Sequence, residues 1–372
     1  MTKADEKFMQ VNMGPQHPST HGVLRLLVTT DGEVLSGVKP YIGYLHRALE
    51  KIAERVTYPQ FTPFTDRLDY LASMNCNLAY AMTVEKLLNI EVPRRAQILR
   101  VIMAELNRIS SHLIAFGSFS SDMGAFTPFL FGIREREFIN DLFEIACGAR
   151  LTYNYIRIGG VSKDIPGGFI EKTREFLDYF PAKIKEYNEL LSYNAIFIKR
   201  LANIAVISPD DAFDYGITGP NLRASGIKWD LRREEPYLIY NELDFEVPVG
   251  KGEMGKTGDA WDRYMMRIYE MEQSAKIVRQ CLDLLAPGDY TAKVSKVLKP
   301  PAGEVYVRAE NPRGELGFYL ISDGSTKPYR LKIRAPSFAN LSIIPKLARG
   351  VMIADLIAII GSMDIILPEI DR

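Results

Sequence analysis

Apolar residues recur at intervals of three and four positions along most of the chain between residues 65 and 285. This spacing places them on one face of an α-helix, so each such segment is expected to be helical and to bury that face. Pro93 and the run Pro166-Gly167-Gly168 separate neighbouring segments, because both residue types disfavour the interior of a helix. The segments with helical spacing are 65–89, 94–116, 135–155, 170–201 and 260–285.

Strand patterns flank this helical part of the 372-residue chain. Residues 23–43 alternate apolar and polar positions around Asp31-Gly32, a dipeptide favoured in β-hairpin turns. The strand pattern returns over 303–334, and a last helix is expected over about 339–361. No repeat or long linker divides the sequence, so the prediction is one α+β domain that is mainly α. Its expected parts are an N-terminal β region (1–40), a helical body (41–290), a small β region (300–336) and a C-terminal helix and tail (338–372).

The charge balance and the cysteines exclude several classes of protein. Lysine and arginine number 46, as do aspartate and glutamate, so no overall positive charge attracts nucleic acid, and no nucleic-acid partner is expected. Cys76, Cys147 and Cys281 form no CxxC pair, which argues against a disulfide framework and against an iron–sulfur cluster bound by this chain. The most apolar tract, 351–361, contains Asp355 and is too short to span a bilayer.

A glycine-rich stretch, GKGEMGKT at residues 250–257, matches the phosphate-loop pattern G-x-x-x-x-G-K-[ST]. A true phosphate loop begins its helix at the Gly-Lys-Thr, so that the helix N-terminus faces phosphate. Here Gly258 and Asp259 intervene, and Asp259 is the better candidate to cap the following helix. Pro248 also interrupts the segment that would have to be the preceding strand. We expect a loop without phosphate, and nucleotide binding stays an alternative.

Two of the four histidines, His17 and His21, lie in the short stretch GPQHPSTHG. A metal ligand, a nucleophile, a cap and a substrate contact are all compatible with this spacing. A zinc site would need two further ligands, and His46 and His112 belong to separate helical segments. The pattern therefore disfavours zinc and leaves the other roles open.

Nine stretches occur in an order that resembles one family. They are GPQHPSTHGVLRL, TDRLDYLASMNCNLAYAMTVEKLL, ELNRISSHL, IREREFINDLFE, RIGGV, GPNLRASGIKWDLRREEPY, GDAWDRY, RAPSFANL and the C-terminal IDR. Together they resemble the D-type subunits of NADH:quinone oxidoreductase, the large peripheral-arm subunits of respiratory complex I, from about residue 12 to residue 372. That family is related to the large subunits of nickel–iron hydrogenases, so the resemblance implies a hydrogenase-large-subunit-like helical body.

The related hydrogenases hold their metals with two CxxC motifs. The matching positions here are Asp69 and Ala72, just after Arg67, and Ile366 and Glu369 near the C-terminus. None of the four is cysteine, so no metal is expected and a hydrogenase-type metalloenzyme is disfavoured. The resemblance implies instead a cavity between a helix and the C-terminus that takes a quinone headgroup. It also implies that electrons arrive from a terminal iron–sulfur cluster held by a neighbouring subunit, with no cofactor bound by this chain.

Reduction of a quinone to quinol takes two electrons and two protons, so the site needs hydrogen-bond donors that can release protons. The resemblance assigns these roles to Tyr70, His21 and Asp122. Tyr70 would donate to one carbonyl and His21 to the other, while Asp122 would orient and charge His21. Arg67, expected on the same helix as Tyr70, would lie near the cluster. The further candidates for the pocket or the cluster-facing surface are His17, Asp69 and Ile366.

The resemblance also implies partners and a location. The partners would be the terminal-cluster subunit, the C-type subunit, a ferredoxin-like subunit and the membrane subunit at the quinone channel. The chain would be peripheral, on the cytoplasmic side of the cell inner (plasma) membrane. One departure is Thr152, where many family members have histidine; threonine cannot titrate, which favours a low-potential acceptor such as menaquinone. A scaffold subunit without chemistry is the remaining alternative.

Overall fold

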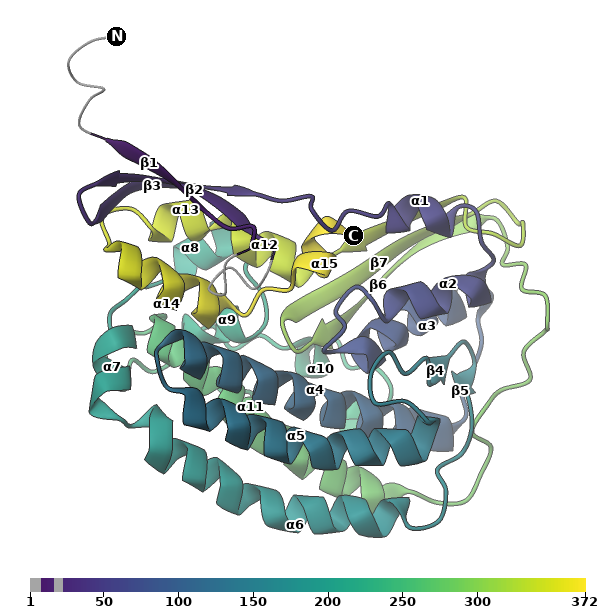
Figure 1. Cartoon of the computed structure of the whole chain (residues 1–372). Helices are drawn as coiled ribbons and strands as arrows, with labels where there is room; N and C mark the ends of the chain where they lie inside the picture. The colour runs from purple at the N-terminus through teal and green to yellow at the C-terminus, as the bar shows by residue number, and fades with distance from the viewer. Residues whose placement is uncertain (1–7, 17–22) are drawn as a thin grey trace.

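The structure is a computed structural model that describes residues 8–16 and 23–372. Four long helices lie side by side in the lower part of Figure 1, with the two three-stranded sheets above them. The predicted α+β class, mainly α, is confirmed. The long helices are α4 (Arg94–Asp122), α5 (Phe126–Cys147), α6 (Phe169–Tyr187) and α11 (Ala260–Leu284), and the two-stranded pair β4 (Ile156–Arg157) and β5 (Gly160–Val161) lies near α3 and α4.

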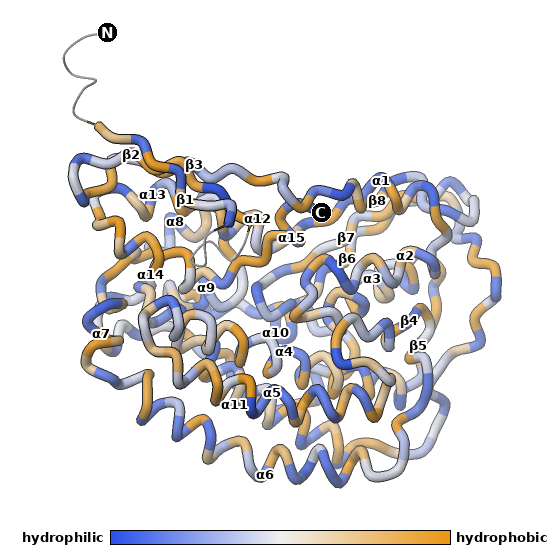
Figure 2. Tube along the Cα trace, viewed as in Figure 1, coloured by the Kyte–Doolittle hydropathy of each residue, from blue (hydrophilic) through white to orange (hydrophobic). Residues whose placement is uncertain are grey.

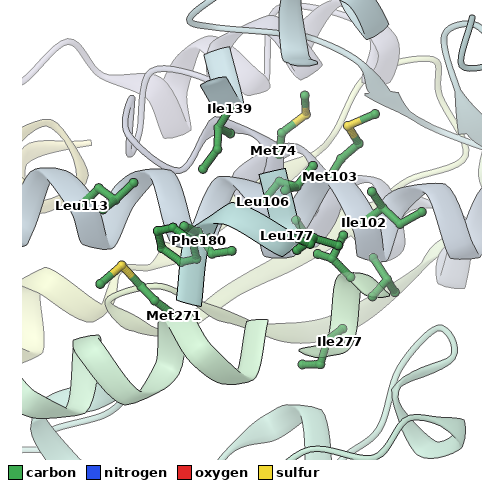
Figure 3. Packing of buried hydrophobic residues seen from close by; sticks show 14 of the residues in the cluster. Met74, Ile102, Met103, Leu106, Leu113, Ile139, Leu177, Phe180, Met271 and Ile277 are labelled. Carbon is green, nitrogen blue, oxygen red and sulfur yellow. The ribbon is translucent and has the colours of Figure 1, made fainter. Parts of the chain in front are cut away.

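Helix α4 is the centre of the main core, and most of its residues are buried. Along α5 and α6 apolar and polar residues alternate turn by turn (Figure 2), as expected for helices that bury one face. Leu106 and Leu113 of α4 lie with Leu177 and Phe180 of α6 and with Met271 of α11 in one apolar cluster (Figure 3). Full burial of each such side chain contributes roughly 1.5–3 kcal/mol to folding.

The N-terminal sheet contains the predicted hairpin and one strand that the pattern missed. The hairpin strands turn at Gly32, which has a φ of 62°, and Leu26 and Val28 point into the second core. Backbone bonds of 2.8 Å join Leu35 to the segment 350–351 in both directions, so the sheet is fixed to the C-terminal helices. The strands are β1 (Met9–Met13), β2 (Arg25–Asp31) and β3 (Val34–Tyr41), antiparallel in that order.

The second sheet packs against a group of N-terminal helices and forms the third core. The Tyr80 ring contacts the Phe318 ring edge to face, with 5.6 Å between their centroids. The strands are β6 (Gly303–Asn311), β7 (Gly314–Ser322) and β8 (Arg330–Arg334), and the helices are α1 (Leu49–Ala53), α2 (Tyr58–Thr65) and α3 (Ser73–Leu88).

Three predicted helices are broken in the structure. The segment 170–201 is divided into α6, the short π-helix η3 (Asn188–Ser192) and α7 (Ala195–Leu201). The segment 65–89 is not one helix: α2 ends at Thr65, a turn follows, and α3 begins at Ser73. The Asp69 carboxylate accepts a hydrogen bond from the backbone N–H of Leu71 at 3.2 Å. This bond favours the turn over a continuous helix at this point. The prediction of a single helix over 339–361 is also wrong, because glycine and proline divide this stretch. Its elements are α12 (Pro336–Ser342), α13 (Ile344–Leu347), α14 (Ile353–Met363) and, in the tail, α15 (Leu367–Asp371).

The glycine-rich stretch 250–257 is a loop that no strand precedes, and α11 begins after Asp259 as predicted. The Asp259 side chain accepts from the backbone N–H of Asp262 at 2.9 Å, which makes it the helix cap. The Asp262 carboxylate in turn accepts from the N–H groups of Gly252 and Gly258 at 3.0 and 3.2 Å. Two backbone donors, one in this loop and one directly after it, are therefore engaged within the chain and are not available to cradle a phosphate.

The remaining elements are short and connect α6 to α11. The short elements are η3 (Asn188–Ser192), α7 (Ala195–Leu201), α8 (Pro209–Asp214), α9 (Pro220–Ala224), α10 (Leu231–Glu234) and η4 (Tyr240–Glu242).

No helix in residues 8–16 and 23–372 is both long and apolar enough to cross a membrane.

Candidate functional site

A cavity of about 380 Å³ lies where the α2–α3 turn, the end of α4 and the C-terminal segment meet. This volume is within the range of small-molecule sites, roughly 300–1,000 Å³. Tyr70 and Leu71 line it from the turn, and residues 364–368 line it from the C-terminal segment. Asp122, the last residue of α4, also lines it. Val23 and Leu45 close it from the N-terminal part of the chain.

Three of the residues predicted for the site meet in this cavity. Tyr70, Asp122 and Ile366 are far apart in sequence, and all three line the same space. His17 and His21 lie outside the described residues, although Val23, two positions beyond His21, lines the cavity. The cavity also includes Ser118 and Asp364, which the sequence reasoning missed. A charged residue inside the apolar tail GSMDIILPEI was the one available signal for Asp364.

Tyr70 is held by the turn rather than by a helix, which corrects the prediction that it shares a helix with Arg67. Asn107 of α4 fixes this turn: its side-chain amide donates to the Leu71 carbonyl and accepts from the Met74 N–H, both at 3.0 Å. The Tyr70 side chain is partly exposed, and burial raises the pKa of its phenol. Because burial disfavours the phenolate, Tyr70 keeps its proton and can donate a hydrogen bond into the cavity.

Arg67 does not line the cavity, because it lies on the outer side of the same turn. Its side chain is 53% exposed and its nearest acidic group is the buried Asp66, at 3.9 Å. The backbone N–H of Asn154 donates to Asp66 at 3.4 Å, so the stretch that contains Thr152 packs against this turn. The stretch that contains Thr152 therefore lies beside the turn that carries Arg67, and neither residue lines the cavity.

Asp69 is also excluded from the cavity lining, because its side chain turns inward to a buried ion pair. Asp69 Oδ2 lies 2.6 Å from Arg313 Nη1, and Arg313 Nη2 lies 3.2 Å from Asp364 Oδ1. Arg267 Nε is 3.4 Å from the other Asp364 oxygen, which joins the cavity wall to α11. The long sequence separations among these partners explain why no local pattern predicted the pairs.

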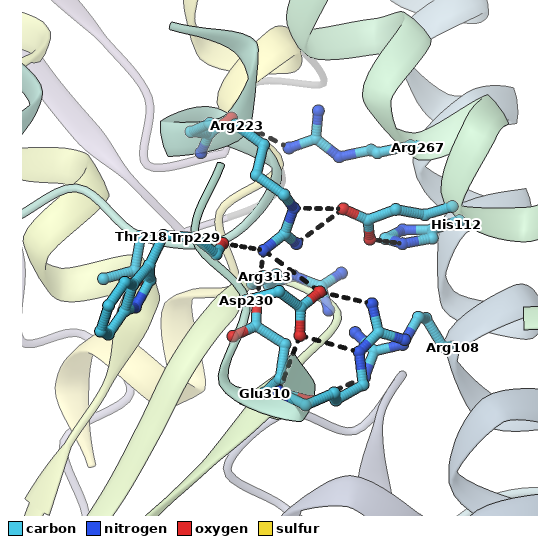
Figure 4. Close-up of polar contacts among 12 residues, drawn as sticks. Arg108, His112, Thr218, Arg223, Trp229, Asp230, Arg267, Glu310 and Arg313 are labelled. Carbon is cyan, nitrogen blue, oxygen red and sulfur yellow. Dashed lines mark hydrogen bonds and ion pairs between the residues drawn. The ribbon is translucent and has the colours of Figure 1, made fainter. Parts of the chain in front are cut away.

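A second group of ion pairs lies in the interior near Arg267. Arg223 pairs with Glu270 of α11 and with Glu310 of β6, with nitrogen–oxygen distances of 2.6 and 2.8 Å. Figure 4 shows Arg223 with Glu310, and His112 beside them. The other Glu270 oxygen contacts His112 Nε2 at 2.9 Å, and burial lowers the pKa of this histidine, so it is neutral at physiological pH. Two neighbouring groups of buried charged residues thus lie between the cavity and the centre of the helical body, and the charge of Glu270 acts on Arg267.

The last residues of the chain bind a segment near the N-terminus beside the cavity. The Asp371 carboxylate accepts from the N–H groups of Gly43 and Leu45 at 2.8 and 2.7 Å. The Asp371 carbonyl lies 2.7 Å from Nδ1 of His46. These contacts hold Leu45 in the cavity wall and explain how a segment near the N-terminus comes to face the C-terminal tail.

Comparisons with known proteins agree with this arrangement. Residues 122–301 and 291–372 match the family model described as the respiratory-chain NADH dehydrogenase, 49 Kd subunit. The chain is 57% identical to a D-type subunit of the NADH-quinone oxidoreductase of Anaeromyxobacter sp. (strain K), over 98% of this chain and 96% of that protein. It is 52% identical to the D-type subunit of the same enzyme in Geotalea uraniireducens (strain Rf4), over 99% of this chain and 100% of that protein. The chain therefore belongs to the family of D-type, or 49 kDa, subunits of NADH-quinone oxidoreductase, the respiratory complex I.

Proposed function

We propose that this chain forms the quinone headgroup pocket of a proton-translocating NADH:quinone oxidoreductase and that the pocket is the cavity between the α2–α3 turn and the C-terminus. The observation that carries the proposal is the meeting of Tyr70, Asp122 and Ile366 around one space of about 380 Å³. Leu71, Ile114 and Leu367 supply apolar walls for a ring, while Tyr70 and Asp122 supply polar groups at its edges. This mixture suits a flat, largely apolar molecule with a carbonyl oxygen at each end.

Tyr70 and His21 are proposed to give the hydrogen bonds that strengthen as charge develops on the two quinone oxygens. Tyr70 keeps its proton because burial raises the pKa of its phenol. His21 would serve the second oxygen, with Asp122 as the carboxylate that orients it and favours its charged form. Arg67, Asp69 and His17 are proposed to support the pocket or face the electron donor.

The electrons are proposed to come from an iron–sulfur cluster held by a neighbouring subunit. Cys76 and Cys281 are buried and Cys147 is partly buried, and their positions on separate parts of the fold cannot hold a cluster. Within residues 8–16 and 23–372 no group of three or more histidine, cysteine or acidic side chains could hold a metal ion. The proposed role of this chain is therefore to bind the quinone and to supply protons.

The proposed partners are the terminal-cluster subunit, the C-type subunit, a ferredoxin-like subunit and the membrane subunit at the quinone channel. The support is the family, whose members are named as subunits of NADH-quinone oxidoreductase. A chain that serves a lipid-soluble quinone has to lie at a membrane, and we propose a peripheral position on the cytoplasmic side of the inner (plasma) membrane.

Substituting Gly361 with valine is expected to damage this pocket. A Cβ atom at Gly361 would lie 2.5 Å from Phe119 Cδ2 and 3.2 Å from Asp122 Oδ2, so α14 would have to move away from α4. Such overpacking costs about 1–3 kcal/mol and would displace the wall that carries Asp122. Gly37→Val is the matched control, because a Cβ there meets no atom within 4 Å. The assembled complex with Gly361→Val should reduce quinone more slowly than the control, and equal rates would contradict the pocket.

The nucleotide-binding alternative predicts a different sensitive residue. Lys256, in the glycine-rich loop, would hold phosphate on that view, and Lys256→Ala would abolish activity. We expect Lys256→Ala to reduce quinone at nearly the normal rate, because the loop lies outside the cavity and the N–H groups of Gly252 and Gly258 are bound to Asp262. The measurement is quinone reduction by the assembled complex, and a complete loss of activity would favour the nucleotide-binding alternative.

A further inference from the structure

Three buried carboxyl groups and two guanidinium groups form a cluster beneath the cavity. The carboxyls belong to Asp69, Asp364 and Glu369, and the guanidiniums to Arg313 and Arg267; none of the five residues is more than 6% exposed. The salt bridges described above pair Asp69 with Arg313, and Asp364 with both arginines. Three acids therefore share two cations, and one carboxyl group is left over.

Glu369, on α15, is the carboxyl group without a cation. Among the residues that the structure describes, none places a positive charge within ion-pair distance of it. Its Oε2 accepts from the Ser337 N–H at 3.2 Å, and its Oε1 has no hydrogen-bond partner in the described chain. A fully buried carboxylate without a cation costs several kcal/mol, so this geometry favours the protonated, neutral form.

The negative charge that faces Glu369 also favours its protonated form. Burial, followed by the negative charge of Asp69, raises the pKa of Glu369 to about 8, and the more distant Arg313 opposes this only in part. Cys76 of α3 also faces the pair, and burial raises the pKa of its thiol, so it adds no charge. With a proton on Glu369 the two aspartates balance the two arginines, and without it the cluster carries one negative charge.

We propose that Glu369 holds a proton beneath the quinone pocket and that this proton replaces the one that Tyr70 gives to the quinone. The inference rests on the proposed function and adds a residue to it. Asp69 and Arg313 influence both groups: Asp69 precedes Tyr70 in the turn, and the charges of Asp69 and Arg313 act on the Tyr70 phenol and on the Glu369 carboxyl.

The proton balance is simple. The Tyr70 O–H bond breaks as an O–H bond forms on the reduced quinone, and the electrons come from the proposed donor in the neighbouring subunit. The Glu369 O–H bond then breaks as the phenol O–H reforms. Glu369 is left as a carboxylate and takes a proton from solvent before the next turnover. It acts through Tyr70 and not on the quinone, so it is a positioning and supply residue.

Glu369→Gln in the assembled complex tests the proposal. Glutamine keeps an acceptor for the Ser337 N–H and the shape of the side chain, but it has no proton to release. Infrared spectra of the resting wild-type complex should contain a protonated-carboxyl C=O band that disappears as the pH rises through about 8 and is absent in Glu369→Gln. Asp69→Asn should move the midpoint of this band to lower pH, because it removes the negative charge that faces Glu369. Glu304→Gln, at an exposed position on β6, is the control and should keep the band.

The pH dependence of turnover gives the second readout. Quinone reduction by the wild type should slow as the pH rises through about 8, where Glu369 loses its proton. Glu369→Gln should be about tenfold slower, less than for a donor that acts on the quinone itself, and its rate should not change across this range.

Each of three results would overturn the proposal. The wild-type complex could lack the band, the band could persist in Glu369→Gln, or Glu369→Gln could keep the wild-type pH profile of turnover. The wild-type titration decides even if the variant fails to assemble. If Tyr70→Phe reduces quinone slowly and Glu369→Gln at the normal rate, only the proposed proton supply is contradicted. If Tyr70→Phe is fully active, the proposed quinone pocket is contradicted as well.

Discussion

Tyr70→Phe is expected to lower quinone reduction by the assembled complex by roughly a hundredfold or more. The substitution removes only the phenolic hydroxyl, and losing one donor to a charge that develops in the transition state costs about 2.7–4 kcal/mol. Folding should be unaffected, because the Tyr70 side chain is 39% exposed and the turn is held by Asn107 and Asp69. Electron transfer to an artificial acceptor upstream of the quinone reports whether the rest of the complex is intact.

Tyr329→Phe is the matched control, since that tyrosine is 65% exposed and lies outside the cavity. It should reduce quinone at the normal rate. His21→Ala should do damage comparable to Tyr70→Phe, and Asp122→Asn somewhat less. Because the two donors act as a unit, the double variant should fall well short of the product of the single losses. Near-normal turnover of Tyr70→Phe with quinones of every tail length would show that Tyr70 is not the headgroup donor.

Arg313→Met is expected to destabilise the protein by about 3–5 kcal/mol, the usual cost of removing one member of a buried ion pair. Asp69 would lose its only cation within ion-pair distance in the described chain, while Asp364 would keep Arg267. The pKa of Asp69 is already raised by burial, and it would rise further without the arginine. A folded-state pKa above the unfolded value means that the destabilisation is largest at high pH and shrinks as the pH falls and Asp69 is protonated.

The amount of this protein recovered in the complex, and the temperature at which it dissociates, measure the effect. Arg330→Met is the control, because Arg330 is 44% exposed and its pair with Glu54, at 3.0 Å, is a surface salt bridge. Such pairs contribute about 1 kcal/mol or less, so this variant should assemble normally. Equal losses for the two variants would mean that the Arg313 cluster is not important for stability.

Much of the helical body could be predicted from the sequence because its signals are local. The spacing of apolar residues and the cap at Asp259 predicted α11 almost to its ends, and the Asp31-Gly32 turn predicted the hairpin of β2 and β3. The break between α2 and α3 was missed because the periodicity continues through it. The turn there is stabilised by the hydrogen bond of Asp69 to Leu71 and by Asn107, which reaches it from the distant helix α4.

The site could be predicted only in part. The family resemblance placed Tyr70, Asp122 and Ile366 in one site, which residue spacing alone could not do across about 300 positions. The roles of Arg313 and Glu369 were not predictable, because each depends on partners on distant elements. In the sequence, Glu369 was noted only because it lies at a position where the related hydrogenases have a metal-binding cysteine. That no cation of the described residues lies within ion-pair distance of it is a property of the packed structure.

Labelling of the assembled complex with a photoreactive quinone locates the headgroup. The prediction is attachment to peptides that line the cavity, at residues 70–71, 114–122 and 364–368, with loss of labelling when an excess of unmodified quinone is present. A second cavity of similar size, about 410 Å³, lies between α5 and α6 beside Phe138, Phe176 and Tyr179, and it serves as an internal comparison. Specific labelling of that cavity, or of other proteins of the complex alone, would contradict a quinone site between the α2–α3 turn and the C-terminus.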